Sequence, residues 1–272
     1  MRIRSTSIAA GAVFLALGCK GDATGGAPRR ADASAPVGAT VESPGEVIIA
    51  PATAKYTVTT VAAPGSISGT VSFKSALEAT PPISTNADSS TCGATVVDES
   101  AIAAGGASGV VVWLEGVRSG KPVGLERRLE LESMNCKLTP RMQAAVTGSA
   151  VNIIGHDQFR QHLRFVAGGE TAQRATILLG GGEQVIPTEL PFKAPGMVAV
   201  RDSGHAWTHA WLAVFDHPYY ALTGANGAFT IDGVPPGKYT LKAWHERSAV
   251  ASQSVDVGAN GAVKVDLTLE PK

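Results

Sequence analysis

Short runs in which apolar and polar residues alternate recur along most of the chain after residue 56. They are rich in Val, Ile, Thr and aromatic residues, and turn residues separate them. Alternation with a period of two places every second side chain on one face of a strand, so these runs predict half-buried β-strands. The predicted strands are 57–61, 66–73, 109–116, 128–133, 150–155, 197–201, 211–215, 227–234, 237–244, 252–257 and 262–269.

Tight turns are predicted between several of these strands. Segments 224–227 and 258–261 each contain Asn-Gly, a pair that accepts the positive φ angles of hairpin turns. A Pro-Pro-Gly turn follows at 235–237. No run of ten or more residues has a helical stripe, so the sequence predicts an all-β fold.

The first 19 residues follow a different pattern, in which two arginines precede an apolar run over 8–17. A run of about ten residues is typical of a secretory signal and too short to span a membrane. It ends in Ala-Leu-Gly-Cys at 16–19, which resembles a bacterial lipobox with Ala16 in place of the usual leucine. The resemblance implies that Cys19 carries lipid after cleavage, and the alternative is an ordinary secretory signal peptide.

Residues 20–64 are predicted to form a flexible tether. Ala, Gly, Pro, Ser and Thr dominate up to residue 55, and no apolar periodicity is found there. Such a segment buries too little apolar surface to fold alone. We expect it to hold the folded part away from a membrane surface, with strand 57–61 falling in its last part.

The chain contains three cysteines: Cys19, Cys92 and Cys136. If Cys19 carries lipid, the other two form one pair, and an exported protein meets an oxidising environment. The count therefore favours a Cys92–Cys136 disulfide. The alternative is two buried free thiols.

The C-terminal part resembles a carboxypeptidase regulatory-like domain, a transthyretin-like β-sandwich. The resemblance rests on segments 221–246 and 255–270, with an Asn-Gly turn, the strand Phe-Thr-Ile and the turn Val-Pro-Pro-Gly. Such domains usually begin with strands like 67–71 and 110–116, which are present here but far upstream. The resemblance therefore implies one discontinuous sandwich, over 65–118 and 219–272, that is interrupted by residues 119–218.

The interrupting residues 119–218 resemble a cupredoxin, as in a family of exported bacterial proteins that join cupredoxin and regulatory-like domains. In that family, the cysteine of a segment like 135–141 often pairs with an upstream cysteine followed by glycine, as at 92–93. Segment 151–157 corresponds to the strand and loop before the first copper histidine, and Asp-His-Pro-Tyr at 216–219 is intact. The fold expected is a Greek-key cupredoxin-like sandwich inserted in, or joined to, a regulatory-like or carbohydrate-binding-like sandwich.

The copper ligands of this resemblance are largely missing. A blue-copper site needs two imidazoles, a thiolate and a weak axial thioether. When this segment is aligned without gaps to the Cys-x-x-His-x-x-Met copper loop of cupredoxins, Asp202 stands at the cysteine position. His205 then stands at the histidine position and Thr208 at the methionine position. Gln161 stands at the first histidine position, and a one-residue shift to His162 would turn that side chain to the other face of its strand. We therefore expect a scaffold without a blue-copper centre and without another cofactor.

A different metal site is the alternative. Asp202, His205, His209 and His162 offer a carboxylate and imidazoles, a set that suits Zn(II) or Cu(II). These side chains are equally compatible with surface or hydrogen-bonded roles. A further alternative is a carbohydrate-binding module in which exposed Trp207 and Trp211 stack on sugar rings, and burial of both tryptophans in a core is the competing interpretation.

Charge and motifs exclude other classes. Lys and Arg (23) balance Asp and Glu (23), so a nucleic-acid partner is not expected. Segment 65–69 has Ile67 where a nucleophile elbow needs serine, and His245-Glu246 lacks the second histidine of a zinc protease motif because Ala249 is there. We expect no enzyme.

The sequence thus predicts a non-catalytic cell-envelope lipoprotein on the periplasmic side. It would bind or scaffold an envelope protein or a glycan and contact the membrane through lipid on Cys19. Lys20 after that cysteine slightly favours the outer membrane. A metal-binding periplasmic protein centred on His205 is the alternative.

Overall fold

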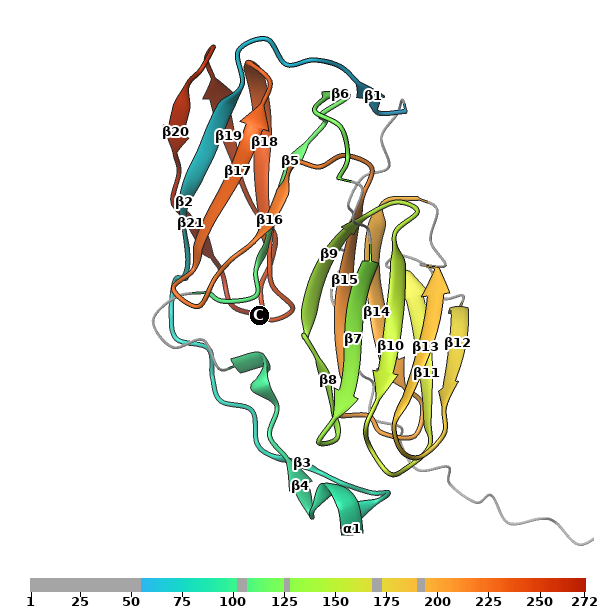
Figure 1. The fold of residues 1–272 in the computed structure, drawn as a ribbon. Helices are drawn as coiled ribbons and strands as arrows, with labels where there is room; N and C mark the ends of the chain where they lie inside the picture. Colours follow the sequence, from blue (N-terminus) through green and yellow to red (C-terminus); the bar gives the residue numbers. More distant parts are fainter. Residues whose placement is uncertain (1–54, 102–106, 125–127, 168–172, 190–193) are drawn as a thin grey trace, which may run out of the picture. The chain divides into compact units, whose positions relative to one another are not determined.

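Strands account for nearly all of the regular structure (Figure 1). The computed structural model describes residues 55–101, 107–124, 128–167, 173–189 and 194–272. Within these ranges the helical elements are two single turns, α1 (Ser89–Cys92) and η1 (Glu99–Ala101). The all-β prediction is therefore confirmed. None of the helices in these ranges is long and apolar enough to cross a membrane.

All described residues belong to one compact unit. The predicted signal segment, the lipid-bearing Cys19 and the tether up to residue 54 lie outside the described residues.

The first sandwich is built from two sheets with strand orders β16-β5-β18-β19 and β17-β2-β20, and β21 also pairs with β2. Side chains from both sheets share one apolar core that includes Ile67, Leu114 and Leu241. The strands are β2 (Gly65–Phe73), β5 (Val111–Glu115), β16 (Tyr220–Leu222), β17 (Ala228–Val234), β18 (Gly237–Trp244), β19 (Ala251–Val257), β20 (Ala262–Lys264) and β21 (Leu267–Leu269).

The second sandwich lies in sequence between β5 and β16. Its sheets have the orders β13-β10-β7-β8 and β12-β11-β14-β15-β9, with a shared core that includes Leu131, Ile153 and Phe165. The strands are β7 (Arg128–Met134), β8 (Lys137–Thr139), β9 (Met142–Val146), β10 (Ala150–Gly155), β11 (Gln161–Ala167), β12 (Gln173–Leu179), β13 (Gln184–Glu189), β14 (Gly196–Asp202) and β15 (His209–Phe215).

A third apolar cluster joins the two sandwiches. Trp211 and Phe215 of β15 pack there with Trp113 of β5 and Trp244 of β18. The rings of Trp211 and Trp244 meet edge to face, with centroids 5.2 Å apart. An edge-to-face contact suits the charge distribution of aromatic rings, so this contact adds to the burial of apolar area.

The predicted turns form as Asn-Gly sequences should. The amide of Gly227 donates to the carbonyl of Gly224 at 2.9 Å, and the amide of Gly261 donates to that of Gly258 at 2.9 Å. Gly227 has φ of 77° and Asn260 has φ of 53°, values that glycine and asparagine tolerate best.

Several strands were not predicted. Strand β11 has an inward-facing Gln161 where the pattern requires an apolar residue, and β13 contains Pro187. Pro187 is tolerated because β13 lies at the edge of its sheet, where one side of the strand needs no donor. Strands β8, β9, β12 and β16 lack a long alternating run of their own.

The last part of the predicted tether contacts the first sandwich. Strand β1 (Thr57–Val58) pairs in parallel with β6 (Ser119–Gly120). The half-buried Tyr56 donates its hydroxyl hydrogen to the carbonyl of Lys121 at 2.6 Å. Residues from 56 onward therefore belong to the folded part. Tyr56 supplies apolar surface, which the sequence of residues 20–55 lacks.

Candidate functional site

The loop 203–208 between β14 and β15 carries the position at which the cupredoxin resemblance would place a metal. Backbone hydrogen bonds close this loop: the amide of Asp202 donates to the carbonyl of Thr208 at 3.1 Å, and the amide of Thr208 donates to that of His205 at 2.9 Å. Because β14 and β15 are paired neighbours, the loop holds His205 and Asp202 close together.

Both ring nitrogens of His205 face a carboxylate. Nδ1 lies 2.7 Å from Oδ2 of Asp202, and Nε2 lies 2.9 Å from Oδ2 of Asp88. The residue is 3% exposed, and the rings of Phe159 and Trp207 lie against it at centroid distances of 4.6 and 5.2 Å. We name the three polar side chains Asp88, His205 and Asp202 the triad.

The triad favours a protonated imidazole. Burial by itself lowers the pKa of His205, but the hydrogen bonds to Asp88 and Asp202 outweigh it, so the pKa is raised above the ordinary 6.5. With both nitrogens protonated, the ring donates one hydrogen bond to each carboxylate. The charge of a buried carboxylate at position 202 is thereby paired, as buried charges must be.

Asp88 reaches the triad from a segment that precedes the second sandwich in sequence. It adopts a left-handed conformation, with φ of 49°, just before the single turn α1. The predicted disulfide is present: Cys92, the last residue of α1, is bonded to Cys136, with 5.7 Å between their Cα atoms. The amide of Cys136 in turn donates to Asp157 at 3.1 Å. The disulfide therefore fastens the segment that supplies Asp88.

Two of the four predicted metal ligands do not join the triad. The side chain of His162 is exposed, while its backbone amide donates to Oδ1 of Asp202 at 3.2 Å. His209 lies at the start of β15, where its Nε2 is 3.2 Å from Oε2 of Glu246. The described residues contain no group of three or more His, Cys, Asp or Glu side chains placed to hold a metal ion.

The other two copper-ligand positions hold hydrogen-bonded polar residues. Gln161 is 1% exposed and accepts a hydrogen bond from Ser133 at 2.5 Å. Thr208 donates its hydroxyl hydrogen to the carbonyl of Cys136 at 3.2 Å. These donors, with no thiolate and no thioether, do not fit a blue-copper centre.

Neither tryptophan predicted to stack on a ligand is exposed. Trp207 packs against His205 and is 5% exposed, and Trp211 is 7% exposed within the contact between the sandwiches. The prediction of a stacking surface made by this pair is therefore corrected. Alternation along β15 places Trp211 on the face that the first sandwich covers.

A second polar cluster surrounds Glu246, at the end of the first sandwich. Trp211 Nε1 donates to its Oε2 at 3.0 Å, and Arg141 donates from Nη2 to Oε2 at 3.2 Å and from Nε to Oε1. Burial raises the pKa of Glu246, but hydrogen bonds from His209 and Arg141 outweigh that effect and hold it well below its ordinary range. Arg141 also binds Asp98 at 3.0 Å. No motif indicated this cluster.

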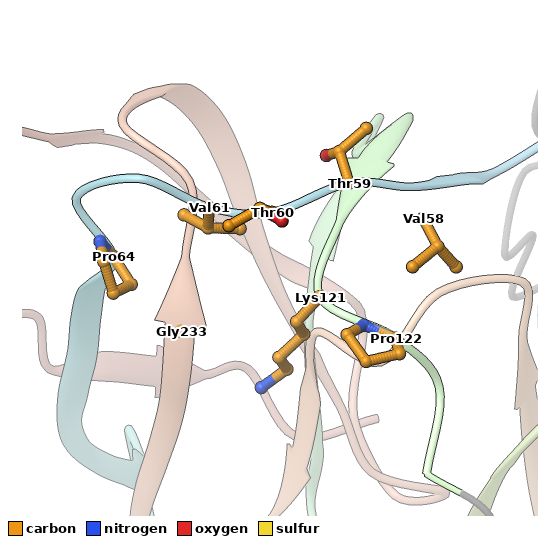
Figure 2. A pocket seen from close by; sticks show the side chains of 8 residues that line it. All are labelled: Val58, Thr59, Thr60, Val61, Pro64, Lys121, Pro122 and Gly233. Atoms are coloured by element: carbon orange, nitrogen blue, oxygen red, sulfur yellow. The ribbon is translucent and has the colours of Figure 1, made fainter.

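Two cavities are formed by described residues. One of about 460 Å³ is lined by Arg141, Met142, Trp211 and Glu246 among others, so it adjoins the Glu246 cluster. The other, of about 560 Å³, lies between the strap of residues 58–64 and the segment that carries Lys121 and Pro122 (Figure 2). Lys121 lies 5.1 Å from the centre of the Tyr219 ring and donates to the carbonyl of Asp232, so its ammonium group already has partners.

Comparison with known families gives one match. The profile of the carboxypeptidase regulatory-like domain matches residues 196–270. This match begins at β14 in the second sandwich. It then covers β15 and the strands β16 to β21 of the first sandwich. No curated protein sequence matches this chain.

Solved structures of copper proteins show partial similarity. A copper-containing nitrite reductase from Thermus scotoductus SA-01 has 16% identity and a TM-score of 0.28, over 37% of this chain and 24% of that one. A reduced amicyanin variant has 16% identity and a TM-score of 0.28, and the match covers 32% of this chain and 81% of the amicyanin. A purple cupredoxin from Nitrosopumilus maritimus has 16% identity and a TM-score of 0.27, and the match covers 32% of this chain and 98% of that cupredoxin. Nothing about copper in this chain follows from similarity at this level.

The triad predicts a distinctive dependence of stability on pH. Because the pKa of His205 is raised in the folded state, its stabilising contribution is complete below pH 6.5 and is lost as the pH rises through the folded pKa. Replacing His205 by Gln should lower the free energy of unfolding at pH 6 by about 1–3 kcal/mol and remove this dependence. Urea unfolding between pH 6 and pH 9 measures both effects.

The exposed His162→Gln serves as the control and should retain the dependence of the parent chain. Stability that changes with pH identically in the His205→Gln variant and the parent would contradict the proposed charge state of the triad.

The Glu246 cluster predicts strong coupling between two residues. Arg141→Leu leaves a largely buried carboxylate without its main partner and should lower the free energy of unfolding by about 2–4 kcal/mol. The double variant Arg141→Leu with Glu246→Leu removes both charges and should lose less than the sum of the single losses. Urea unfolding of the parent, the two single variants and the double variant gives the coupling, and Arg128→Leu at an exposed position of β7 is the control. Additive losses would show that the pair is not coupled.

Proposed function

We propose that this chain is a non-catalytic binding or scaffolding module of the cell envelope, on a cupredoxin-like sandwich whose metal position is closed. The observation that carries this proposal is the triad, in which each ring nitrogen of His205 faces a carboxylate. A metal binds the lone pair of an unprotonated imidazole nitrogen, and a doubly protonated ring has none. Side chains at the metal position therefore serve to hold the loop.

The remaining histidine–carboxylate neighbours also support a role without catalysis. Burial lowers the pKa of His245 to about 4, and its Nδ1 accepts a hydrogen bond from the amide of Arg247 at 3.2 Å. Glu246 accepts from Arg141 and Trp211. Hydrogen bonds within the fold thus engage Nδ1 of His245 and both oxygens of Glu246, which supports a structural role for these groups.

A reduced metal site is the second candidate, because one partner of His205 is accessible. The side chain of Asp88 is 42% exposed, whereas that of Asp202 is 1% exposed. A Cu(II) or Zn(II) ion that displaced the proton on Nε2 would have His205 and Asp88 as ligands from the protein. Two ligands are fewer than the three or four of ordinary zinc sites.

Export and a lipid anchor on Cys19 complete the proposal. The disulfide supports it, because such bonds persist in oxidising compartments such as the periplasm. Membrane attachment through lipid would leave both sandwiches free to bind an envelope partner or a glycan.

A metal titration tests the closed position. Calorimetry of the full chain with Cu(II) and with Zn(II) at pH 7 should show no stoichiometric binding, because the ion must displace the proton that Nε2 of His205 donates to Asp88. Binding of one ion per chain at micromolar affinity, lost in His205→Ala and retained in His162→Ala, would establish the metal site and overturn the closed scaffold.

A mass measurement tests the anchor. When the full chain is expressed in a bacterial host, the protein should be recovered with membranes, and its N-terminal peptide should begin at a lipid-modified Cys19. Cys19→Ala should abolish the modification and the membrane recovery. A mature protein without lipid in the soluble periplasmic fraction would show an ordinary secretory signal peptide instead.

A further inference from the structure

One face of the five-stranded sheet carries a line of three arginines and one histidine. On β11 the side chains of Gln161, Leu163 and Phe165 are buried in the sandwich. Alternation therefore turns His162 and Arg164 to the opposite face, where both are exposed. The exposed Arg160 continues this line immediately before β11, and Arg201 of β14 lies beside it. We name Arg160, His162, Arg164 and Arg201 the cationic strip.

The strand register brings two of these arginines face to face. Arg164 is paired directly with Arg201 across β11 and β14, which are hydrogen-bonded neighbours in the five-stranded sheet. Like charges in directly opposed positions destabilise a sheet. Within the described part of the chain, the side chains of Arg160, Arg164 and Arg201 form no ion pair with a carboxylate. The arrangement therefore does not serve the stability of the sheet.

Arg201 is the most constrained member of the strip. Its guanidinium lies 5.4 Å from the centre of the Trp211 ring, and the residue is half-buried. Burial lowers its pKa, Arg164 and Arg141 lower it further, and Glu246 opposes them. The planar group is therefore held in one place against an aromatic ring, with its hydrogen-bond donors unused by described residues.

The nearest carboxylates are already engaged elsewhere. Glu246 accepts hydrogen bonds from Arg141 and Trp211, and Asp98 also binds Arg141. Asp202 lies one residue after Arg201 and points into the interior, toward His205. Glu246 still interacts electrostatically with Arg201, but no ion pair within the described part of the molecule neutralises the strip.

We propose that the cationic strip binds an acidic polysaccharide, a linear chain with carboxylate or sulfate groups. Side chains two residues apart on a strand are separated by about 6.5–7 Å, so Arg160, His162 and Arg164 lie at regular intervals along a line, with a guanidinium group at each end of it. Arginine binds carboxylate and sulfate-like oxygens through paired donors. This inference rests on the proposed binding function and names its ligand.

The surface favours this ligand over two other anionic partners. A folded acidic protein needs an interface with an apolar centre, and the strip offers mainly Leu178, which is paired with His162 and 59% exposed. Binding to anionic membranes usually involves clusters of about four to eight Lys or Arg, and the strip has fewer. A narrow line of cations suits a single extended chain.

Calorimetry of the full chain with a heparin-derived decasaccharide at low salt tests the proposal. We expect binding that weakens as salt increases, because ion contacts are screened. Arg164→Gln and Arg201→Gln should each weaken binding about tenfold, the change expected when one charge-assisted contact is lost. Arg128→Gln removes an exposed arginine from β7 in the other sheet and should change binding less than about twofold.

Three outcomes would overturn the inference: no binding of the decasaccharide, equal binding by the parent and Arg164→Gln, or loss of equal size in Arg128→Gln. Binding to phosphatidylglycerol vesicles or to a poly-glutamate peptide, without binding to the decasaccharide, would also overturn it. Arg164 is exposed, so its variant should fold, and circular dichroism confirms that. The metal titration does not involve this surface, so failure of the closed metal position and failure of this inference are separately visible.

Discussion

Strand β15 is buried on both faces, and the arrangement of the described sandwiches depends on this constraint. Ala210, Leu212 and Val214 face the core of the second sandwich, while Trp211 and Phe215 face the cluster shared with the first. A strand covered on both sides needs an almost unbroken apolar sequence, and Trp-Leu-Ala-Val-Phe at 211–215 supplies it. Polar residues are therefore confined to the ends of β14 and β15, where the triad and the Glu246 cluster are found.

The need to pair buried charge explains both polar clusters. A carboxylate at position 202 is almost completely buried, so it requires a charged or hydrogen-bonding partner, and His205 is that partner. Once His205 is protonated and enclosed by Phe159 and Trp207, its second nitrogen requires an acceptor, which Asp88 provides. Burial of Asp202 thus requires His205, and burial of His205 requires Asp88. The disulfide at Cys92 keeps the segment with Asp88 in place, so it helps to hold the loop together with the hydrogen bonds of the triad.

Local patterns in the sequence revealed most strands but only part of the site. Alternation located β2, β10, β14 and β18, because each has one face in a core, and it missed β11 because the buried Gln161 interrupts the pattern. The cysteine count was enough to predict the disulfide. Asp202 and His205 could be paired because they are close in sequence. Asp88 could not be found, since it lies 117 positions from His205 and nothing in its segment marks it. Glu246 was missed for the same reason, because its partners Arg141 and Trp211 come from another sandwich.

The outer face of the five-stranded sheet has two parts, which differ in whether their positively charged side chains form ion pairs. Near β15 and β9, the first sandwich covers the face and brings Glu246, which pairs with Arg141 close to His209. Near β11 and β14, no described carboxylate forms an ion pair with Arg164 or Arg201, although their opposed charges repel. In the covered part, Glu246 pairs with Arg141, so the positive charge there is neutralised by a carboxylate of the same chain. The uncovered part has no ion-paired carboxylate among the described residues, and the proposed acidic ligand would remove this difference between neighbouring strands.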